Sequence, residues 1–417
     1  MIIGTPLRQQ YLDIKRRHPD AILLFRIGDF YEAFDDDARI LARELGIVLT
    51  SKPMGRNVRV PLAGVPYHSL ERHLATLIAR GHRVAICEQL TAAPVKGETG
   101  RGLIERDVVR VVTPGTIIEP GLLRSKVNNY LAAFCSDGRR AGIAYADVTT
   151  GEFAATELDA TAALSELQRI APSEILISRS CETPNSDLPG FITRGDDDFF
   201  VPQLARATLL QHFEARTLSA FGLSRSPLAA TAAGAVVAYL RHTQAASAGQ
   251  LTRLTSYHTG NFMLLDPQTL RSLEIFDGFG GAPSLLATLD ATRTAMGGRR
   301  LRQWLRQPLL NVNEIMLRHD HVAWFVEHGK ARAELFAALE FVHDLERLSG
   351  RVRAGLASAQ EALALGQSLE TIPRVRAVLQ QDQRRFESLL AALPACAVAL
   401  AADDGPMQNY LARTYQP

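Results

Sequence analysis

Short apolar runs alternate with amphipathic stretches through the first 115 residues of the chain. Residues 21–25, 47–50 and 84–87 are largely apolar and bounded by turn formers, which predicts strands. Residues typical of helix starts and stops predict helices over about 5–17 and 69–79. A further helix with an acidic start is expected after the first strand and ends at Gly46. Strands that alternate with helices indicate a small mixed α/β domain, which we place at residues 1–115.

A second strand pattern follows a segment that we interpret as a linker, at residues 116–127. Residues 130–135 and 142–148 are joined by the turn Ser136-Asp137-Gly138, and residues 151–157 continue the hairpin. We expect this sheet to be completed by helix 160–170, strand 174–178 and an alanine-rich helix at about 227–243. This pattern predicts a second α/β domain, at residues 128–245.

Long helical periodicities fill the rest of the chain, at residues 250–417. Asp266 is a good N-cap, and Pro267 occupies the first helical position, where proline is tolerated. Further helices are expected at about 284–306, 312–328, 331–349 and 357–381. Because the chain stops within this pattern at Pro417, we expect the helical domain to be incomplete.

Composition and charge are those of a soluble globular protein. Apolar residues make up 47% of the chain and charged residues 22%. A chain of 417 residues is too long for one ordinary core, so two to four domains are expected. No apolar run is long enough to cross a bilayer and no signal-peptide pattern is present, which indicates a cytoplasmic protein. The four cysteines form no Cys-x-x-Cys pair, so neither a zinc site nor a disulfide framework is indicated. The net charge of +2 neither requires nor excludes nucleic acid.

An aromatic residue and a carboxylate stand two positions apart just after the first apolar run, as Phe30 and Glu32. We expect a strand-to-helix corner here, with Asp29 as the helix N-cap. Such a corner lets side chains project from the body of the protein. From the residues alone, Phe30 is more simply a core residue and Glu32 a solvated carboxylate at a helix start.

Basic residues that contact phosphates are the second candidate feature. Lys52, Arg56 and Arg59 lie in a predicted loop rich in glycine and proline at residues 51–59, and Arg110 is a more distant candidate. A solvated surface loop explains them equally well.

Several short motifs follow one another along the chain: Gly28-Asp29-Phe30-Tyr31-Glu32, Ala63-Gly64-Val65-Pro66-Tyr67-His68, Val84-Ala85-Ile86-Cys87-Glu88-Gln89, Leu273-Glu274-Ile275 and Leu301-Arg302-Gln303-Trp304-Leu305. In these motifs the chain resembles the MutS family of DNA mismatch-repair proteins. The resemblance implies a mismatch-binding domain, a ribonuclease H-like connector, and an all-α core or lever region. It also implies that Phe30 wedges into the minor groove beside a mispaired or unpaired base and that Glu32 hydrogen-bonds that base.

The resemblance further implies partners and cofactors. The partners would be double-stranded DNA with mismatches or small loops, a MutL-type protein and, in the full-length protein, a second copy of the chain. The setting would be the bacterial cytoplasm, in association with the nucleoid. Full-length members are ATPases that use ATP and Mg²⁺. This sequence lacks the Gly-x-x-x-x-Gly-Lys-Ser/Thr run that cradles phosphates. We therefore interpret it as an N-terminal fragment without clamp or ATPase, not an enzyme, and expect no cofactor or metal in it.

Two other functions are considered. The chain is alternatively an interaction scaffold, in which connector and core bind a MutL-type partner with little DNA binding. Asp147 suggests a nuclease because the connector resembles ribonuclease H, but two-metal chemistry needs several converging carboxylates and one strand aspartate does not supply them. The arginines at residues 299–306 alternate with Leu301, Trp304 and Leu305 at helical spacing, which favours a packed helix over a DNA contact.

Overall fold

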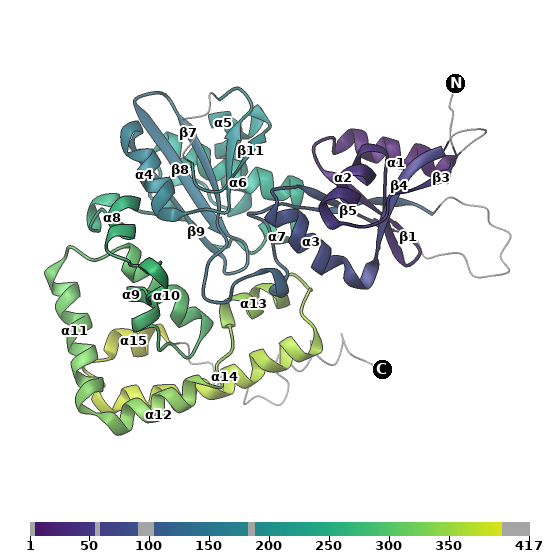
Figure 1. The fold of residues 1–417 in the computed structure, drawn as a ribbon. Coiled ribbons are helices and arrows are strands. Elements are labelled where there is room, and N and C mark those ends of the chain that lie inside the picture. The colour runs from purple at the N-terminus through teal and green to yellow at the C-terminus, as the bar shows by residue number, and fades with distance from the viewer. Residues whose placement is uncertain (1–4, 55–58, 91–103, 182–187, 394–417) are drawn as a thin grey trace.

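The structure, a computed structural model, describes residues 5–54, 59–90, 104–181 and 188–393. Two α/β bodies lie side by side, and a group of helices lies below them, with the long helix α14 (Ala359–Leu379) along one edge (Figure 1). Two mixed sheets followed by a largely helical region confirm the predicted fold class. The predicted domain boundaries stay a prediction. No helix in these four ranges combines the length and the apolar character needed to cross a membrane.

The first sheet has six strands in the order β3-β4-β2-β1-β5-β6. Helix α1 (Pro6–Arg17) packs on one face through Tyr11 and Ile14. Helices α2 (Asp35–Leu45) and α3 (Leu70–Ala79) pack on the other face through Leu41, Leu74 and Leu77. The strands are β1 (Ile22–Ile27), β2 (Phe30–Phe34), β3 (Thr50–Pro53), β4 (Arg59–Pro66), β5 (Val84–Gln89) and β6 (Arg106–Val112).

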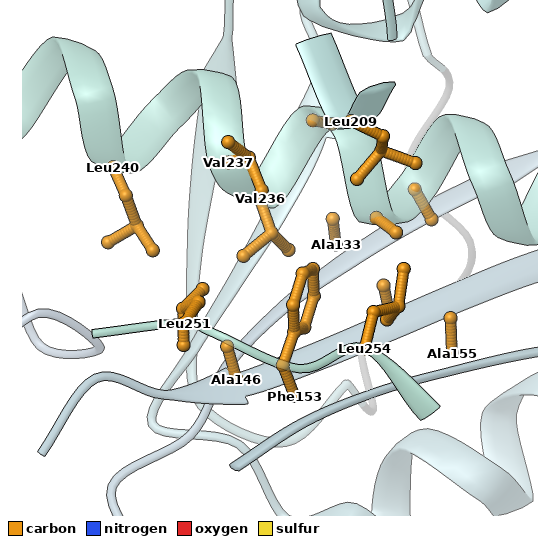
Figure 2. Packing of buried hydrophobic residues seen from close by; sticks show 14 of the residues in the cluster. Ala133, Ala146, Phe153, Ala155, Leu209, Val236, Val237, Leu240, Leu251 and Leu254 are labelled. Carbon is orange, nitrogen blue, oxygen red and sulfur yellow. The ribbon is translucent and has the colours of Figure 1, made fainter. Parts of the chain in front are cut away.

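The second sheet has the order β11-β10-β7-β8-β9-β12 and is also covered on both faces. Helix α4 (Ala160–Ile170) packs on one face, and α5 (Pro202–His212) and α6 (Pro227–Thr243) on the other (Figure 2). Helix α6 lies so close to the sheet that a Cβ on Gly142 would come within 2.2 Å of the Leu228 carbonyl. The strands are β7 (Leu131–Ser136), β8 (Arg140–Asp147), β9 (Glu152–Asp159), β10 (Glu174–Ser178), β11 (Phe191–Gly195) and β12 (Thr255–Ser256).

The helical part has a small core of its own. Trp324 and Phe386 meet edge to face with ring centroids 5.0 Å apart, and both are buried. The Asp266 cap is confirmed, since its carboxylate accepts a hydrogen bond from the Thr269 backbone N–H. The short helix α7 (Ala245–Ala248) precedes this part and contributes Ala248 to the core of the second sheet. The helices of this part are α8 (Pro267–Ser272), α9 (Leu285–Leu289), α10 (Ala295–Arg306), α11 (Val312–Glu327), α12 (Gly329–Leu339), α13 (Leu345–Arg353), α14 and α15 (Glu387–Ala392).

Several predicted elements differ from the structure. The expected strand-to-helix corner at Phe30 is a β-hairpin, and Asp29 is not a helix cap, because helix α2 begins only at Asp35. The expected strand at 47–50 starts only at Thr50 and continues to Pro53, so residues 51–53 of the predicted basic loop belong to β3 and Arg59 begins β4. The expected helix 284–306 is two helices, since the chain breaks at residues 290–294.

Candidate nucleic-acid interface

Phe30 is held at the end of a tight hairpin in the first sheet. Strands β1 and β2 pair antiparallel up to Ile27 and Phe30, which leaves Gly28 and Asp29 as a two-residue turn. Gly28 has a φ of +57°, a conformation that glycine adopts at little cost. Phe30 also pairs with Pro66 of β4 on its other side, yet its side chain is 47% exposed. A large apolar ring is therefore fixed at a rigid edge and left open to solvent.

Glu32 lies on the same face of β2 as Phe30, because side chains two positions apart in a strand share a face. Its neighbour on β4 is Gly64, where a Cβ would lie 3.1 Å from the Tyr31 carbonyl oxygen and 3.4 Å from Glu32 Cγ. The glycine leaves the carboxylate room to lie across β4. From β3, Lys52 Nζ donates to Glu32 Oε2 at 3.0 Å. The face thus presents an aromatic ring beside an acid with its own counter-ion.

A second set of side chains supports the hairpin from the opposite face. The Arg26 guanidinium lies 4.3 Å from the centroid of the Tyr67 ring and 5.3 Å from that of Tyr31. The Tyr67 backbone N–H donates to the Asp29 carbonyl at 2.9 Å, which ties the turn to the end of β4. The Tyr31 hydroxyl donates to the Glu88 carboxylate, and burial is the main reason that the pKa of Tyr31 rises to about 12.

Sequence reasoning missed Arg26, Tyr31 and Tyr67 as parts of this tip. The sequence does point to these residues, because Arg26 and Tyr31 flank the Gly28 turn and Tyr67 belongs to the same motif as Gly64. The pairing of β2 with β4, which brings the two motifs together, was not evident from either one.

The four predicted phosphate contacts have different surroundings. Lys52 joins the tip through Glu32. Arg59 lies at the start of β4 and donates to the Ser51 hydroxyl at 2.9 Å and the Ser51 carbonyl at 3.1 Å. Arg56 lies outside the described residues. Arg110, the more distant candidate, lies on edge strand β6, three strands from β2, with its guanidinium paired to the buried Glu119, and its contact with phosphate stays a prediction.

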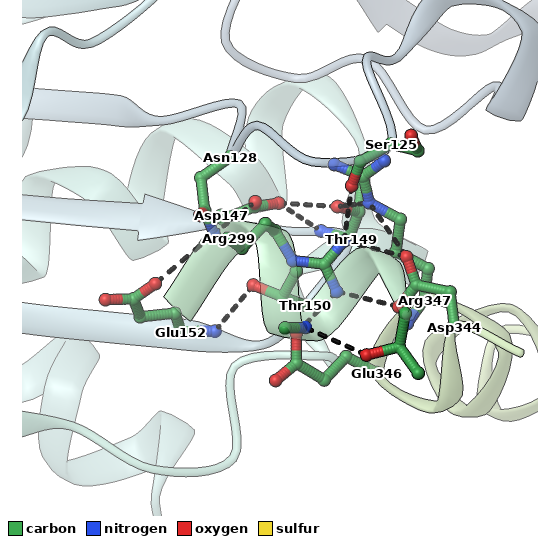
Figure 3. Close-up of polar contacts among 12 residues, drawn as sticks. Ser125, Asn128, Asp147, Thr149, Thr150, Glu152, Arg299, Asp344, Glu346 and Arg347 are labelled. Carbon is green, nitrogen blue, oxygen red and sulfur yellow. Dashed lines mark hydrogen bonds and ion pairs between the residues drawn. The ribbon is translucent and has the colours of Figure 1, made fainter. Parts of the chain in front are cut away.

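Asp147 is fully buried and occupied as a structural acceptor (Figure 3). Its carboxylate accepts from Asn128 Nδ2 at 3.0 Å and from the Asn129 N–H at 3.1 Å. It also accepts from the backbone N–H and the hydroxyl of Thr149, at 2.9 and 2.6 Å. Among the described residues no three His, Cys, Asp or Glu side chains gather as a metal site. These contacts give Asp147 the role of anchoring the linker.

The linker that leaves the first domain is bound by helices α10 and α13. Arg299 of α10 donates to the Ser125 carbonyl at 2.8 Å and pairs with Asp344 at 2.7 Å and Glu346 at 2.6 Å (Figure 3). Its side chain is only 4% exposed, and two carboxylates compensate its charge.

Arg347 of α13 forms the second part of the junction. It donates to the carbonyls of Arg124 at 3.1 Å and Val127 at 2.8 Å, and to the Thr149 hydroxyl at 3.2 Å. The linker, the β8–β9 turn and helix α13 therefore meet at one polar cluster.

Two α/β domains and a helical part meet at one linker, and an aromatic ring projects from a hairpin of the first domain. The chain is thus a modular protein that presents a rigid recognition tip. The chain matches MutS domain I over residues 5–120, MutS domain II over 129–253 and MutS domain III over 268–411. It belongs to the MutS family and carries these three domains in order. Domain I is the mismatch-recognition domain of a family that acts in DNA mismatch repair. No ATPase domain is detected in this chain.

Similar proteins are found across bacteria. The DNA mismatch repair protein MutS of Dehalococcoides mccartyi strain 195 is 48% identical over 376 residues, which cover 89% of this chain and 43% of that protein. The MutS of Symbiobacterium thermophilum is 43% identical, covering 90% and 44%. That of Thermosynechococcus vestitus is 41% identical, covering 94% and 46%. The chain thus spans less than half the length of these relatives.

Proposed function

We propose that this chain recognises mispaired or unpaired bases in duplex DNA through domain I, with Phe30 as a wedge in the minor groove. The observation that carries the proposal is the 47% exposure of Phe30 at a hairpin end that is hydrogen-bonded on both sides. A ring on a flexible loop would yield when pressed into a base stack. Here the strand ladder holds it in place.

The physics of wedging favours a mismatch over matched DNA. Inserting a ring requires a base step to unstack and the duplex to kink, at a cost of a few kcal/mol per step. Mispaired steps are more easily deformed, so the same ring costs less there. Stacking of the base on the ring contributes about 1 to 3 kcal/mol and depends little on which base is present. One aromatic wedge can therefore act at many different mismatches.

Glu32 adds selectivity to the wedge. A carboxylate facing the phosphates is repelled by matched DNA, and a base edge with a free donor offsets that penalty. Lys52 Nζ lies 3.0 Å from Glu32 Oε2, so the positive charge of Lys52 offsets the charge of the carboxylate and reduces its repulsion of phosphates. We infer that Lys52 serves first as the counter-ion of Glu32 and that Arg59 is the better candidate for a phosphate contact.

We further propose that a MutL-type protein and a second copy of the chain are partners of the whole protein. Coupling to ATP and Mg²⁺ would belong to regions other than domains I to III. The residues of this chain offer no phosphate-binding loop of the Gly-x-x-x-x-Gly-Lys-Ser/Thr type, so no step of that chemistry is assigned to them.

The test is fluorescence anisotropy of labelled duplexes with the 417-residue chain at fixed salt. One duplex carries a G·T mismatch, one an unpaired T, and one is fully matched. We expect Phe30→Ala to remove the preference for the first two. Phe279→Ala, which alters a phenylalanine 85% exposed in the helical part, is the control and should keep it.

A mismatch preference that survives Phe30→Ala would refute the wedge. If the chain binds none of the duplexes at low salt but still binds a MutL-type protein, the interaction scaffold becomes the better description.

A further inference from the structure

A small pocket at the contact between the connector and helix α10 is lined by four arginines. It has a volume of about 60 Å³. Its arginines are Arg169 of α4 and Arg299, Arg302 and Arg306 of α10, and no carboxylate is among its lining residues. Asn128, Gln303 and Gln307 add amide groups to the wall. Tyrosine and aliphatic side chains complete it, from Val127, Tyr130, Tyr145, Ile170 and Ala171. The lining is therefore mixed in polarity and strongly cationic.

Two of the four arginines are compensated by carboxylates outside the pocket. Arg169 donates from Nε to Glu166 at 2.8 Å, and Arg299 pairs with Asp344 and Glu346. These two charges are compensated within the fold, although the buried Nε of Arg299 has no hydrogen-bond partner.

Arg302 and Arg306 form no ion pair among the described residues. Both guanidinium groups lie 4.9 Å from the centroid of the Phe276 ring, which contributes a weak cation–π attraction to each. Arg306 Nη1 donates to the carbonyls of Arg169 and Ile170 at 3.1 Å, but its buried Nε has no acceptor. Two positive charges and one unused donor thus stand beside an open pocket.

This arrangement is costly unless an anion completes it. The side chains of Arg302 and Arg306 are both half-buried. A partly buried charge without an ionic partner is unfavourable, and neighbouring like charges increase the cost. Burial, and then repulsion by Arg302, lower the pKa of Arg306 to about 10. Burial also lowers the pKa of Arg302, although the nearby Asp277 and Asp290 act in the opposite direction. Neither aspartate pairs with Arg302, and Asp290 is bound by Lys126 at 2.8 Å.

We propose that this pocket binds one phosphate-sized oxyanion through Arg302 and Arg306. Guanidinium groups suit a tetrahedral oxyanion because their planar forks donate two hydrogen bonds to adjacent oxygens. A volume of about 60 Å³ holds a few water molecules or one such anion. The ligand is free phosphate, or the terminal phosphate of a nucleotide whose base stays outside.

The bound anion would lie at the contact between the two domains that form the pocket and would offset the charge of Arg306, which already binds the connector. The Arg169 and Ile170 carbonyls that accept from Arg306 belong to the connector, and Arg302 and Arg306 to α10. An anion on both guanidinium groups stabilises this contact by mass action. The site lies on domains II and III and does not depend on the proposed function of Phe30.

The test is binding of sodium phosphate to the 417-residue chain, with sodium chloride at equal ionic strength as reference. Thermal unfolding and the ³¹P NMR linewidth of phosphate below the unfolding temperature are both recorded. We expect a saturable rise in the unfolding temperature and saturable line broadening. Arg302→Gln should weaken phosphate binding by roughly tenfold or more, the loss typical of a charge-assisted hydrogen bond. Arg300→Gln, on the exposed side of the same helix, should leave it within about twofold.

The variants and ligands separate the possible results. AMP and ATP that bind more tightly than phosphate, with the same loss in Arg302→Gln, would identify a nucleotide as the source of the phosphate group. An equal phosphate response in the parent and in Arg302→Gln would overturn the proposal. So would a response to phosphate no larger than that to chloride. Because the NMR measurement uses folded protein, a destabilised variant still decides the question.

Discussion

Lys52→Gln tests how the recognition tip balances its charges. In the parent, the Lys52 and Glu32 side chains are 38% and 16% exposed and form an ion pair of no net charge. The substitution leaves an uncompensated carboxylate on the face that carries Phe30. We expect the chain to bind both matched and G·T duplexes more weakly, because the tip then repels phosphates.

The size of the effect follows from the partial burial of the pair. Exposed ion pairs contribute about 0.2 to 1 kcal/mol, and this half-buried pair belongs at the upper end. One kcal/mol corresponds to roughly a fivefold loss of affinity. The loss should be larger for matched DNA, because a mispaired base can still donate to Glu32. The ratio of mismatch to matched affinity should therefore rise.

The assay is anisotropy over a range of salt concentrations, with a double variant. Lys52→Gln combined with Glu32→Gln leaves the net charge of the tip unchanged. If Lys52 is only the counter-ion of Glu32, the dependence of log K on log salt stays that of the parent. If Lys52 contacts a phosphate, the slope becomes shallower by about 0.9.

A control variant and a refuting outcome complete the test. Arg39→Gln removes a charge from the exposed Arg39–Asp36 pair on helix α2, away from the tip, and should change neither affinity nor preference. A fall in mismatch preference in Lys52→Gln, or no change in either affinity, would refute the counter-ion role.

Three further predictions concern stability and reactivity. Asp147→Asn replaces one acceptor oxygen by a donor, which leaves buried groups unpaired at a cost of about 1 to 3 kcal/mol; calorimetry should show a lower unfolding temperature, and an unchanged one would contradict the anchoring role. Gly28→Ala forces a side chain to a φ of +57°, at about 1 to 2 kcal/mol; amide exchange in residues 22–34 should become faster, whereas unchanged exchange would show that the turn adapts. Burial raises the pKa of the Cys87 and Cys135 thiols to about 12; a disulfide reagent at pH 8 should label them only on unfolding, and rapid labelling of folded protein would contradict this.

Local pattern predicted the layout of the fold well. The apolar runs at residues 84–87 and 174–178 are strands, and the alanine-rich helix is α6 at Pro227–Thr243. These elements bury continuous apolar surface, and their ends carry turn or cap residues, so neighbouring residues suffice to define them.

The errors share a physical cause, which is pairing across long sequence separations. Phe30 was expected at a helix start, because the acidic residues after it suit a helix and its β-strand partner, Pro66, is remote in sequence. The helix expected at 284–306 breaks where Asp290 binds Thr292 and the distant Lys126.

The candidate site was predicted in part. The family resemblance singled out Phe30 and Glu32, and the structure places them on one face of β2. The contact between Glu32 and Lys52 could not be predicted, because it crosses β4 and needs the space that Gly64 leaves.

The junction in Figure 3 has a mechanical consequence. Each of the consecutive residues 124–129 is tied by a hydrogen bond or ion pair to the connector, α10, α13 or the Asp290 turn. The Lys126 stem also lies against Gly298, where a Cβ would come within 2.5 Å of it. A segment in which every residue is bound to its surroundings cannot bend freely. Any torque that a kinked duplex exerts on domain I would reach α13 as rotation, instead of being absorbed as bending of the linker.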